Sequence, residues 1–238
     1  YPYAAPMAEG FNYIRNSVKV VVDAYNGSVE FYVVDAQDPL LRMYRKAFPS
    51  LFRDLDEIPG DLRNHMRYPV GIFSAQARMY LRYHVTDPQV FFNQAEQWAI
   101  PLETRFGKRG VRVTPSYLVL QNPGEDQEEF VLMLPFTPAG DKKNLVGWMV
   151  ARNDGPNYGQ LVSYQVPSNP QVDGPSQVEA RIENDQDISQ QFTLWEGAGS
   201  QIIRGQLLVI PVADTIIYVE PLYLQSEVLA FPELKKVI

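Results

Sequence analysis

The sequence predicts an α+β protein, mostly antiparallel sheet built from hairpins, with an inserted helical subdomain and a second helical pair. Segments rich in β-branched and aromatic residues come in pairs joined by short turn-forming stretches, which favours antiparallel neighbours. Apolar residues at helical spacing gather in groups instead of alternating with single strands. We therefore expect one soluble domain over residues 1–238, with a helical subdomain at about residues 39–100.

The first strands are expected at residues 18–22 and 29–34. Asn26-Gly27 lies between these β-branched runs. This dipeptide is the strongest short-range signal for a hairpin, because a type I′ turn needs positive φ at both central positions. The pair predicts an antiparallel hairpin with a type I′ turn.

The segment 39–100 is expected to be helical. One apolar stripe at helical spacing follows residue 39, Pro59 suits the first position of a helix, and Asp87-Pro88 is typical of an N-cap and its following proline. The residues that define the stripes are Leu40, Leu41, Tyr44 and Phe48; Leu62, His65 and Met66; Phe73, Ala77, Tyr80, Leu81 and His84; and Phe91, Ala95 and Trp98.

The rest of the chain returns to strands, with one helical interruption. Turn-rich connections such as Pro123–Gln127 predict antiparallel pairing here. Strands are expected at 112–121, 128–135, 145–152 and 160–166, a helical pair through Val178 and Ile182 and through Ile188, Phe192 and Trp195, and a closing hairpin of Leu207–Pro211 with Thr215–Tyr223. Leu234–Ile238 resembles the opening of one more strand.

Composition excludes several classes of protein. The chain has 21 Lys and Arg against 28 Asp and Glu, a formal charge of −7, which disfavours nucleic acid as a partner. Without cysteine there are no disulfides, thiolate nucleophiles or zinc fingers. The longest apolar runs have seven residues, whereas a membrane-spanning helix needs about 20.

The usual cofactor and catalytic motifs are missing. The sequence contains no P-loop, dinucleotide-binding, nucleophile-elbow or zinc-protease signature, and we expect no cofactor and no metal. Gly197–Ser200 follows a predicted helix, so it indicates a helix end instead of a phosphate loop. Asp185–Glu196 faintly resembles a calcium loop but has Gln190 where the sharp turn needs glycine, and we expect a helix there.

His65, His84 and Asp87 are the candidate catalytic residues. Two histidines that converge beside a carboxylate could form a metal site or a general base. Both histidines lie on apolar helical stripes, so a structural role is the main alternative, and Asp87 is explained equally well as an N-cap.

Two charged stretches have solvent exposure as their simplest explanation. Glu125, Asp126, Glu128 and Glu129 form an acidic run that fits a solvated loop, while carboxylate pairs in general could serve a glycosidase. Arg105–Arg112 holds four basic residues in eight. It could dock an anionic partner or form an exposed linker.

Three strings of residues run in order through nearly the whole chain: Asn12–Lys19 continuing to Asp23–Tyr25, Gly174–Ile182 followed by Asp187–Gln191, and Leu207–Pro211 followed by Tyr218–Gln225. Together they resemble the uncharacterised protein family 0182, large bacterial membrane proteins of unknown function. The resemblance implies transmembrane helices upstream and a soluble region at the cell membrane, which we expect on the extracytoplasmic face. The first residue is Tyr, and we expect the chain to be a piece of a longer protein.

The chain also departs from the pattern of that family. The pattern has an acidic pair after Arg67-Tyr68-Pro69, where this chain has Val70-Gly71, and consecutive acids after Asn93, where it has Gln94-Ala95-Glu96. These departures weaken any mechanism based on carboxylates in the helical subdomain. The resemblance supplies no catalytic residues.

Three functions follow as hypotheses. The first is a non-catalytic module that binds a ligand or a protein partner and is tied to the membrane through flanking segments. The second is an envelope hydrolase that uses a histidine and a carboxylate. The third is a scaffold for the membrane part. The mutual geometry of the histidines and a carboxylate discriminates the second from the others.

Overall fold

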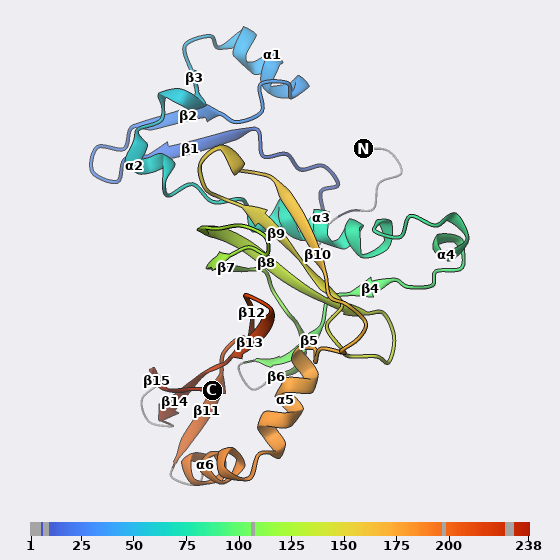
Figure 1. Ribbon diagram of the computed structural model, residues 1–238. Coiled ribbons are helices and arrows are strands. Elements are labelled where there is room, and N and C mark those ends of the chain that lie inside the picture. Colours follow the sequence, from blue (N-terminus) through green and yellow to red (C-terminus); the bar gives the residue numbers. More distant parts are fainter. Residues whose placement is uncertain (1–5, 7–9, 106–107, 197–198, 227–230) are drawn as a thin grey trace. The chain divides into compact units, whose positions relative to one another are not determined.

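A computed structural model describes residues 6, 10–105, 108–196, 199–226 and 231–238 (Figure 1). It contains helices and mostly antiparallel sheets, which confirms the α+β class. The chain divides into two compact units, Tyr1–Ala75 and Gln76–Ile238, and the boundary lies inside one helix. Each unit has its own sheets.

The first unit contains a three-stranded sheet. β1 (Val18–Val22) pairs antiparallel with β2 (Val29–Val33), as the sequence predicts. β2 then pairs parallel with β3 (Phe52–Asp54), and α1 (Pro39–Ala47) makes the crossover between them. This is the one parallel pairing among the described strands. β3 was not among the strands predicted from the sequence.

The predicted type I′ turn is wrong. The strands end at Val22 and resume at Val29, so the loop has six residues, and of its residues only Gly27 has positive φ, at 74°. The carboxylate of Asp23 accepts hydrogen bonds from the backbone N–H groups of Tyr25 and Asn26. This side-chain bonding gives the chain an alternative to the two-residue turn.

The block 39–100 is less helical than predicted. Its helices are α1, a 3₁₀ turn at Leu55–Glu57, α2 (Gly60–Arg63), α3 (Val70–Tyr83) and α4 (Pro88–Phe92). Two short strands interrupt them, β3 and β4 (Trp98–Ala99), and the boundary between the units falls within α3. Helical spacing of apolar residues could not distinguish these short extended pieces.

The main sheet of the second unit follows the prediction closely. Its strands run in the order β10-β9-β8-β4, with β7 also paired to β8, all antiparallel. Their bounds are β7 (Ser116–Gln121), β8 (Glu128–Pro138), β9 (Gly147–Arg152) and β10 (Leu161–Gln165). The buried residues that pack together on it are Leu120, Val131, Met133, Leu145, Trp148, Val150 and Val209.

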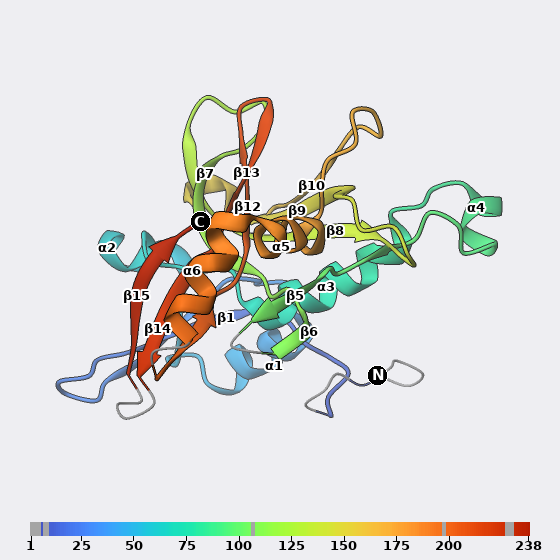
Figure 2. The same ribbon diagram turned by 90° about the horizontal axis from the view of Figure 1, so that it is seen from below.

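Smaller sheets and the helical pair complete the second unit. The helices, drawn in orange in Figure 2, are α5 (Pro175–Asn184) and α6 (Gln186–Glu196). α5 packs against β5 (Leu102–Arg105), and α6 lies against β11 (Ser200–Arg204). The hairpins are β5 (Leu102–Arg105) with β6 (Lys108–Arg112), and β12 (Leu208–Val212) with β13 (Thr215–Val219). A third sheet has the order β11 (Ser200–Arg204), β14 (Pro221–Ser226), β15 (Pro232–Val237).

These elements confirm the helical pair, the closing hairpin and the final strand. The predicted segment Thr215–Tyr223, however, is divided between two sheets, because β13 ends at Val219 and β14 begins at Pro221. None of the described helices combines the length and the apolar character that crossing a bilayer requires.

Candidate functional site

The carboxylate of Asp38 organises one corner of the first unit. It caps α1 by accepting hydrogen bonds from the N–H groups of Leu40 (2.8 Å) and Leu41 (3.1 Å). It also accepts one from the hydroxyl of Ser17, at 2.7 Å. The Ser17 hydrogen bond is the largest cause of the lowered pKa of Asp38, with the two helix N–H groups and the charge of Arg15 adding to it against the effect of burial.

The same corner fastens the N-terminal segment to the sheet. Arg15 forms an ion pair with Asp35, Nη2 to Oδ2, at 2.6 Å, and its Nε lies 3.6 Å from Asp38. The carbonyl of Ser17 accepts hydrogen bonds from the N–H groups of Val34 and Asp35. Residues 15–17 are therefore held against the start of α1.

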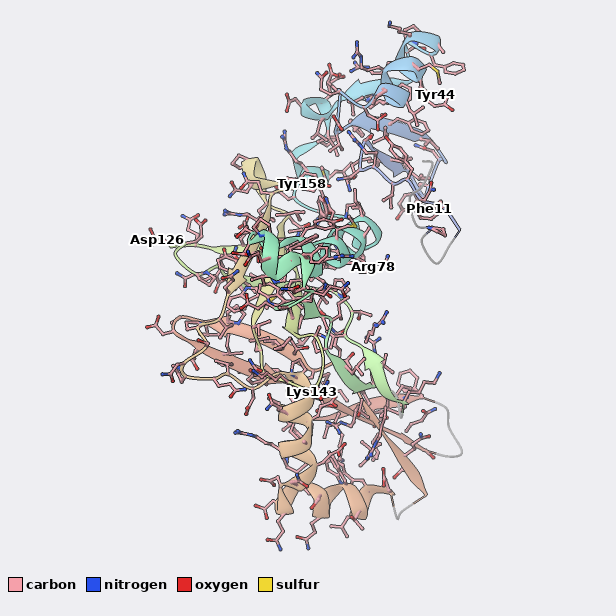
Figure 3. The ribbon with its side chains drawn as sticks, turned by 90° about the vertical axis from the view of Figure 1, so that its right-hand side faces the viewer. Phe11, Tyr44, Arg78, Asp126, Lys143 and Tyr158 are labelled. Atoms are coloured by element: carbon pink, nitrogen blue, oxygen red, sulfur yellow. The ribbon has the colours of Figure 1, made fainter. Side chains whose placement is uncertain are left out.

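A groove of about 490 Å³ opens at this corner. Its walls come from the N-terminal segment, α1 and β3, and its surface is mostly apolar, with Arg15, Ser17 and Asp38 as polar members. Phe11 and Tyr44, both labelled in Figure 3, are half-exposed residues of its lining. The remaining lining residues are Tyr13, Ile14, Val18, Leu40, Leu41 and Phe52. An apolar concavity with a few fixed polar groups is the usual form of a ligand site.

The structure places the three candidate catalytic residues in separate settings. His65 is exposed after α2, in the first unit. Asp87 caps α4, accepting hydrogen bonds from the N–H groups of Gln89 (2.8 Å) and Val90 (3.0 Å), so the predicted N-cap is confirmed. A catalytic role for these residues stays a prediction.

His84 is held on both sides of its ring. Nδ1 lies 2.9 Å from the carbonyl oxygen of Tyr80, and Nε2 lies 3.1 Å from the carbonyl oxygen of Glu96. The ring stacks on Trp98 with centroids 3.9 Å apart. Both ring nitrogens of His84 therefore lie within hydrogen-bond distance of a backbone carbonyl oxygen.

A cluster of buried charges in the second unit was missed by sequence reasoning. Arg204, on β11, makes a two-point ion pair with Glu220, at 2.6 and 2.8 Å, and a third contact with Glu183 on α5, at 2.8 Å. Nearby, Glu179 accepts a hydrogen bond from the N–H of Thr104 at 2.6 Å. The side chain of Glu220 is fully buried and Arg204 is nearly so.

Glu103 is the most perturbed acid of this cluster. One oxygen accepts a hydrogen bond from the N–H of Leu207 at 3.3 Å, and the other lies 3.5 Å from Nε of Arg105 without a hydrogen bond. Burial raises the pKa of Glu103 to about 7, with Arg105 and the Leu207 N–H opposing and Glu179 and Glu220 adding to the rise. Burial likewise raises the pKa of Glu179.

Arg204 keeps its charge in this buried setting. Burial alone would lower its pKa, but the hydrogen bonds and charge of Glu220, with Glu179 and Glu183, outweigh burial and raise the pKa. The cluster is a network of ion pairs that joins β11, α5 and the β13–β14 corner. Among the described residues no group of three histidine or acidic side chains is arranged to hold a metal ion.

The acidic run is not simply a solvated loop, which corrects the sequence interpretation. Asp126 lies at the exposed tip between β7 and β8 (Figure 3), but Glu129 is buried. Arg152 donates to Glu129 at 2.6 Å and to Glu125 at 2.9 Å. These residues line a polar hollow of about 480 Å³.

The other motif interpretations have mixed outcomes. Arg105–Arg112 is not a linker, because β5 and β6 pair as a hairpin on either side of residues 106–107, which lie outside the described part of the chain. The helix predicted through the calcium-like stretch is confirmed, since Asp185 caps α6 through the N–H groups of Asp187 and Ile188. Of the glycine loop, residues 197–198 lie outside the described residues, and β11 begins at Ser200.

Comparison with known proteins places the chain in a family. A family model described as Uncharacterised protein family (UPF0182) matches residues 1–195. The chain belongs to this family. Three relatives, each described as a UPF0182 protein, match its whole length, with 52% identity in Pelotomaculum thermopropionicum, 52% in Desulforamulus reducens and 50% in Moorella thermoacetica.

The matches cover only part of each relative. The chain spans 26%, 25% and 26% of the lengths of these three proteins, about a quarter of each. No solved structure matches the chain. The family description assigns no activity, so the function has to be argued from the sites above.

Signals for the missed features were partly present in the sequence. Asp38-Pro39 repeats the pattern of Asp87-Pro88, and the same reasoning would have found the cap of α1. The charge cluster had no such signal, because Glu103, Glu179, Arg204 and Glu220 come from distant parts of the sequence and meet only in the folded unit.

Proposed function

We propose that the chain is a non-catalytic binding module of a longer bacterial membrane protein, and that it works at the extracytoplasmic face. The groove between the N-terminal segment and α1 carries this proposal. Its apolar lining would supply affinity, while Arg15 and Asp38, held in place by ion pairing and hydrogen bonds, would fix the orientation of a ligand or partner segment.

The geometry gives less support to a hydrolase. A general base has to reach a proton on the substrate or on one water molecule. The nitrogens of His84 face two backbone carbonyls instead. We expect no hydrolysis of p-nitrophenyl acetate or p-nitrophenyl phosphate beyond that of the His84→Ala variant, and a clear difference would favour the hydrolase.

Photocrosslinking in the full-length protein tests the groove. A benzophenone amino acid at position 44 lies on the groove, whereas one at position 25 stands on a fully exposed loop of the same unit. We expect a discrete adduct, identified by mass spectrometry, at position 44 and none at position 25. Equal labelling at the two positions, or none at either, contradicts the groove as the binding site.

Cysteine labelling tests the compartment. Because the chain has no cysteine, a Lys142→Cys variant of the full-length protein introduces one exposed thiol into it. We expect a membrane-impermeant maleimide to label intact cells, relative to the same protein without the substitution. Labelling only after the cells are permeabilised would place the chain on the cytoplasmic side and overturn that part of the proposal.

A further inference from the structure

The outer face of α1 is apolar and exposed. Leu40, Met43 and Tyr44 recur at helical spacing and are 52%, 56% and 50% exposed. Phe48, directly after the helix, continues the same stripe and is 54% exposed. Only Leu41 of the helix is buried. A helix that needs its apolar face for its own unit would turn more of these side chains inward.

The other face of α1 is basic. Arg42, Arg45 and Lys46 follow one another on the opposite side of the helix, and the helix itself has no acidic residue. Arg45 contacts Asp54 at 3.1 Å, and Arg42 and Lys46 are exposed. This run of positive charge stands out in a chain whose formal charge is −7.

The two faces together indicate the occupant. Apolar side chains on one side and Lys or Arg along the other are the pattern of a helix that lies in the surface plane of a membrane. Anionic headgroups attract each basic residue near the surface. A second copy of the chain would need an interface of about 800 Å² per partner. The helix is about 14 Å long and offers far less than that.

We propose that α1 docks on an anionic lipid surface, with Leu40, Met43, Tyr44 and Phe48 entering the boundary between headgroups and acyl chains. Arg42, Arg45 and Lys46 then lie at the level of the headgroups. This inference rests on the proposed function, which supposes that the chain works next to a membrane. A single short helix binds weakly, and tethering to the membrane raises its effective concentration at the surface.

Vesicle flotation of the 238-residue chain tests the proposal. The two vesicles are phosphatidylcholine with 30% phosphatidylglycerol and pure phosphatidylcholine. We expect at least tenfold stronger partitioning to the anionic vesicles, and loss of that preference in 0.5 M salt, because screening weakens the attraction. Equal partitioning to both vesicles would overturn the proposal.

Matched variants separate the two faces of the helix. Phe48→Asp should weaken partitioning at least tenfold, whereas Leu194→Asp, at a 65% exposed site on α6, should not change it. Arg42→Gln with Lys46→Gln should weaken it about 25-fold, at about fivefold for each charge. Lys142→Gln with Lys143→Gln, on an exposed loop, is the control. Hydrogen exchange of the β1 and β2 amides shows that the first unit is folded in each variant.

The outcomes distinguish this inference from the proposed function. Wild-type binding that is unaffected by both α1 variants would assign the lipid contact to another surface and overturn the inference. A dimer that Phe48→Asp dissociates, without vesicle binding, would assign the face to a second copy. A protein adduct at position 44 without vesicle binding would likewise reject the lipid and leave the proposed binding module intact.

Discussion

The exposed apolar face of α1 in the first unit and the buried charges around Arg204 in the second unit differ in what satisfies them. The first unit leaves large apolar side chains such as Met43 and Phe48 in contact with solvent. The second unit buries charged side chains, with Glu103 and Glu220 almost fully enclosed. Exposed apolar area is unfavourable unless something covers it, and a buried charge is unfavourable unless it is paired.

This difference separates the roles of the two units. In the second unit Arg204 forms ion pairs with Glu183 and Glu220. These buried charges are therefore compensated inside the unit, without any other molecule. In the first unit the exposed face of α1 has no such partner among the described residues, and we propose that another surface covers it. The following predictions test this contrast, from the largest effect on stability to the smallest.

Removing the guanidinium of Arg204 should destabilise the second unit most. The Arg204→Met variant leaves Glu220 buried without its partner, which typically costs about 3–5 kcal/mol. Urea unfolding followed by tryptophan fluorescence measures this directly, because Trp98, Trp148 and Trp195 all lie in the second unit. Arg109→Met, at a side chain 82% exposed, is the control and should change stability by less than about 0.5 kcal/mol.

Glu103 should make the stability of the second unit depend on pH. Its pKa is about 7 in the folded chain against an ordinary value of 4.5, so the folded state binds more protons and stability falls as pH rises from about 4.5 to 7. The fall should be about 3 kcal/mol. Glu103→Gln should remove most of it, making the variant relatively more stable at pH 8 than at pH 5.

The check on this prediction is the same urea experiment at both pH values. Glu128→Gln, at an exposed site on β8, is the matched substitution. A wild-type stability that is flat or rises between pH 5 and 8, while Glu103→Gln follows it in parallel, would show that Glu103 is ionised throughout in the folded chain.

Loss of the Asp38 cap should have a moderate effect confined to the first unit. Asp38→Ala removes the acceptor for the N–H groups of Leu40 and Leu41 and for the Ser17 hydroxyl, and an N-cap alone is worth about 1 kcal/mol. Hydrogen exchange of the α1 amides should quicken about fivefold or more. Asp87→Ala should instead affect α4, and no change in α1 for Asp38→Ala would contradict the assigned cap.

The exposed face of α1 should contribute least to stability. Met43→Ser with Phe48→Ser should change the unfolding free energy of the first unit by no more than about 0.5 kcal/mol for each site, since both side chains are half-exposed. Circular dichroism during urea unfolding measures it. A loss of several kcal/mol would mean that these residues pack within the unit, and the contrast between the units would fail.

The sequence predicted most of the regular elements, because hairpin strands and amphipathic helices carry local periodic signals. The antiparallel strands β7–β10 and the helix pair α5 and α6 follow directly from such patterns. β3, only three residues long, has no room for a pattern, and its partner β2 lies beyond α1 in the chain. The prediction of a type I′ turn at Asn26-Gly27 was wrong because the side chain of Asp23 accepts competing hydrogen bonds from the loop backbone.

The sites were harder to predict than the elements. Histidines are candidate catalytic residues by residue type, yet both ring nitrogens of His84 lie against backbone carbonyls. The groove depends on how Arg15, Ser17 and Asp38 meet across a corner, and the buried charges depend on hydrogen bonds between residues 16 to 104 positions apart in the sequence. Such contacts are set by the fold and leave no periodicity in the sequence.

The burial of Glu103 also couples folding of the second unit to the uptake of a proton from the solution. At pH 6 its carboxyl is mostly protonated in the folded chain and mostly ionised in the unfolded one, so folding takes up about one proton from the buffer. The heat of unfolding measured by calorimetry should then differ between buffers with different enthalpies of ionisation. A fall in the pH of the surrounding solution from 7 toward 5 would therefore favour the folded form of the second unit.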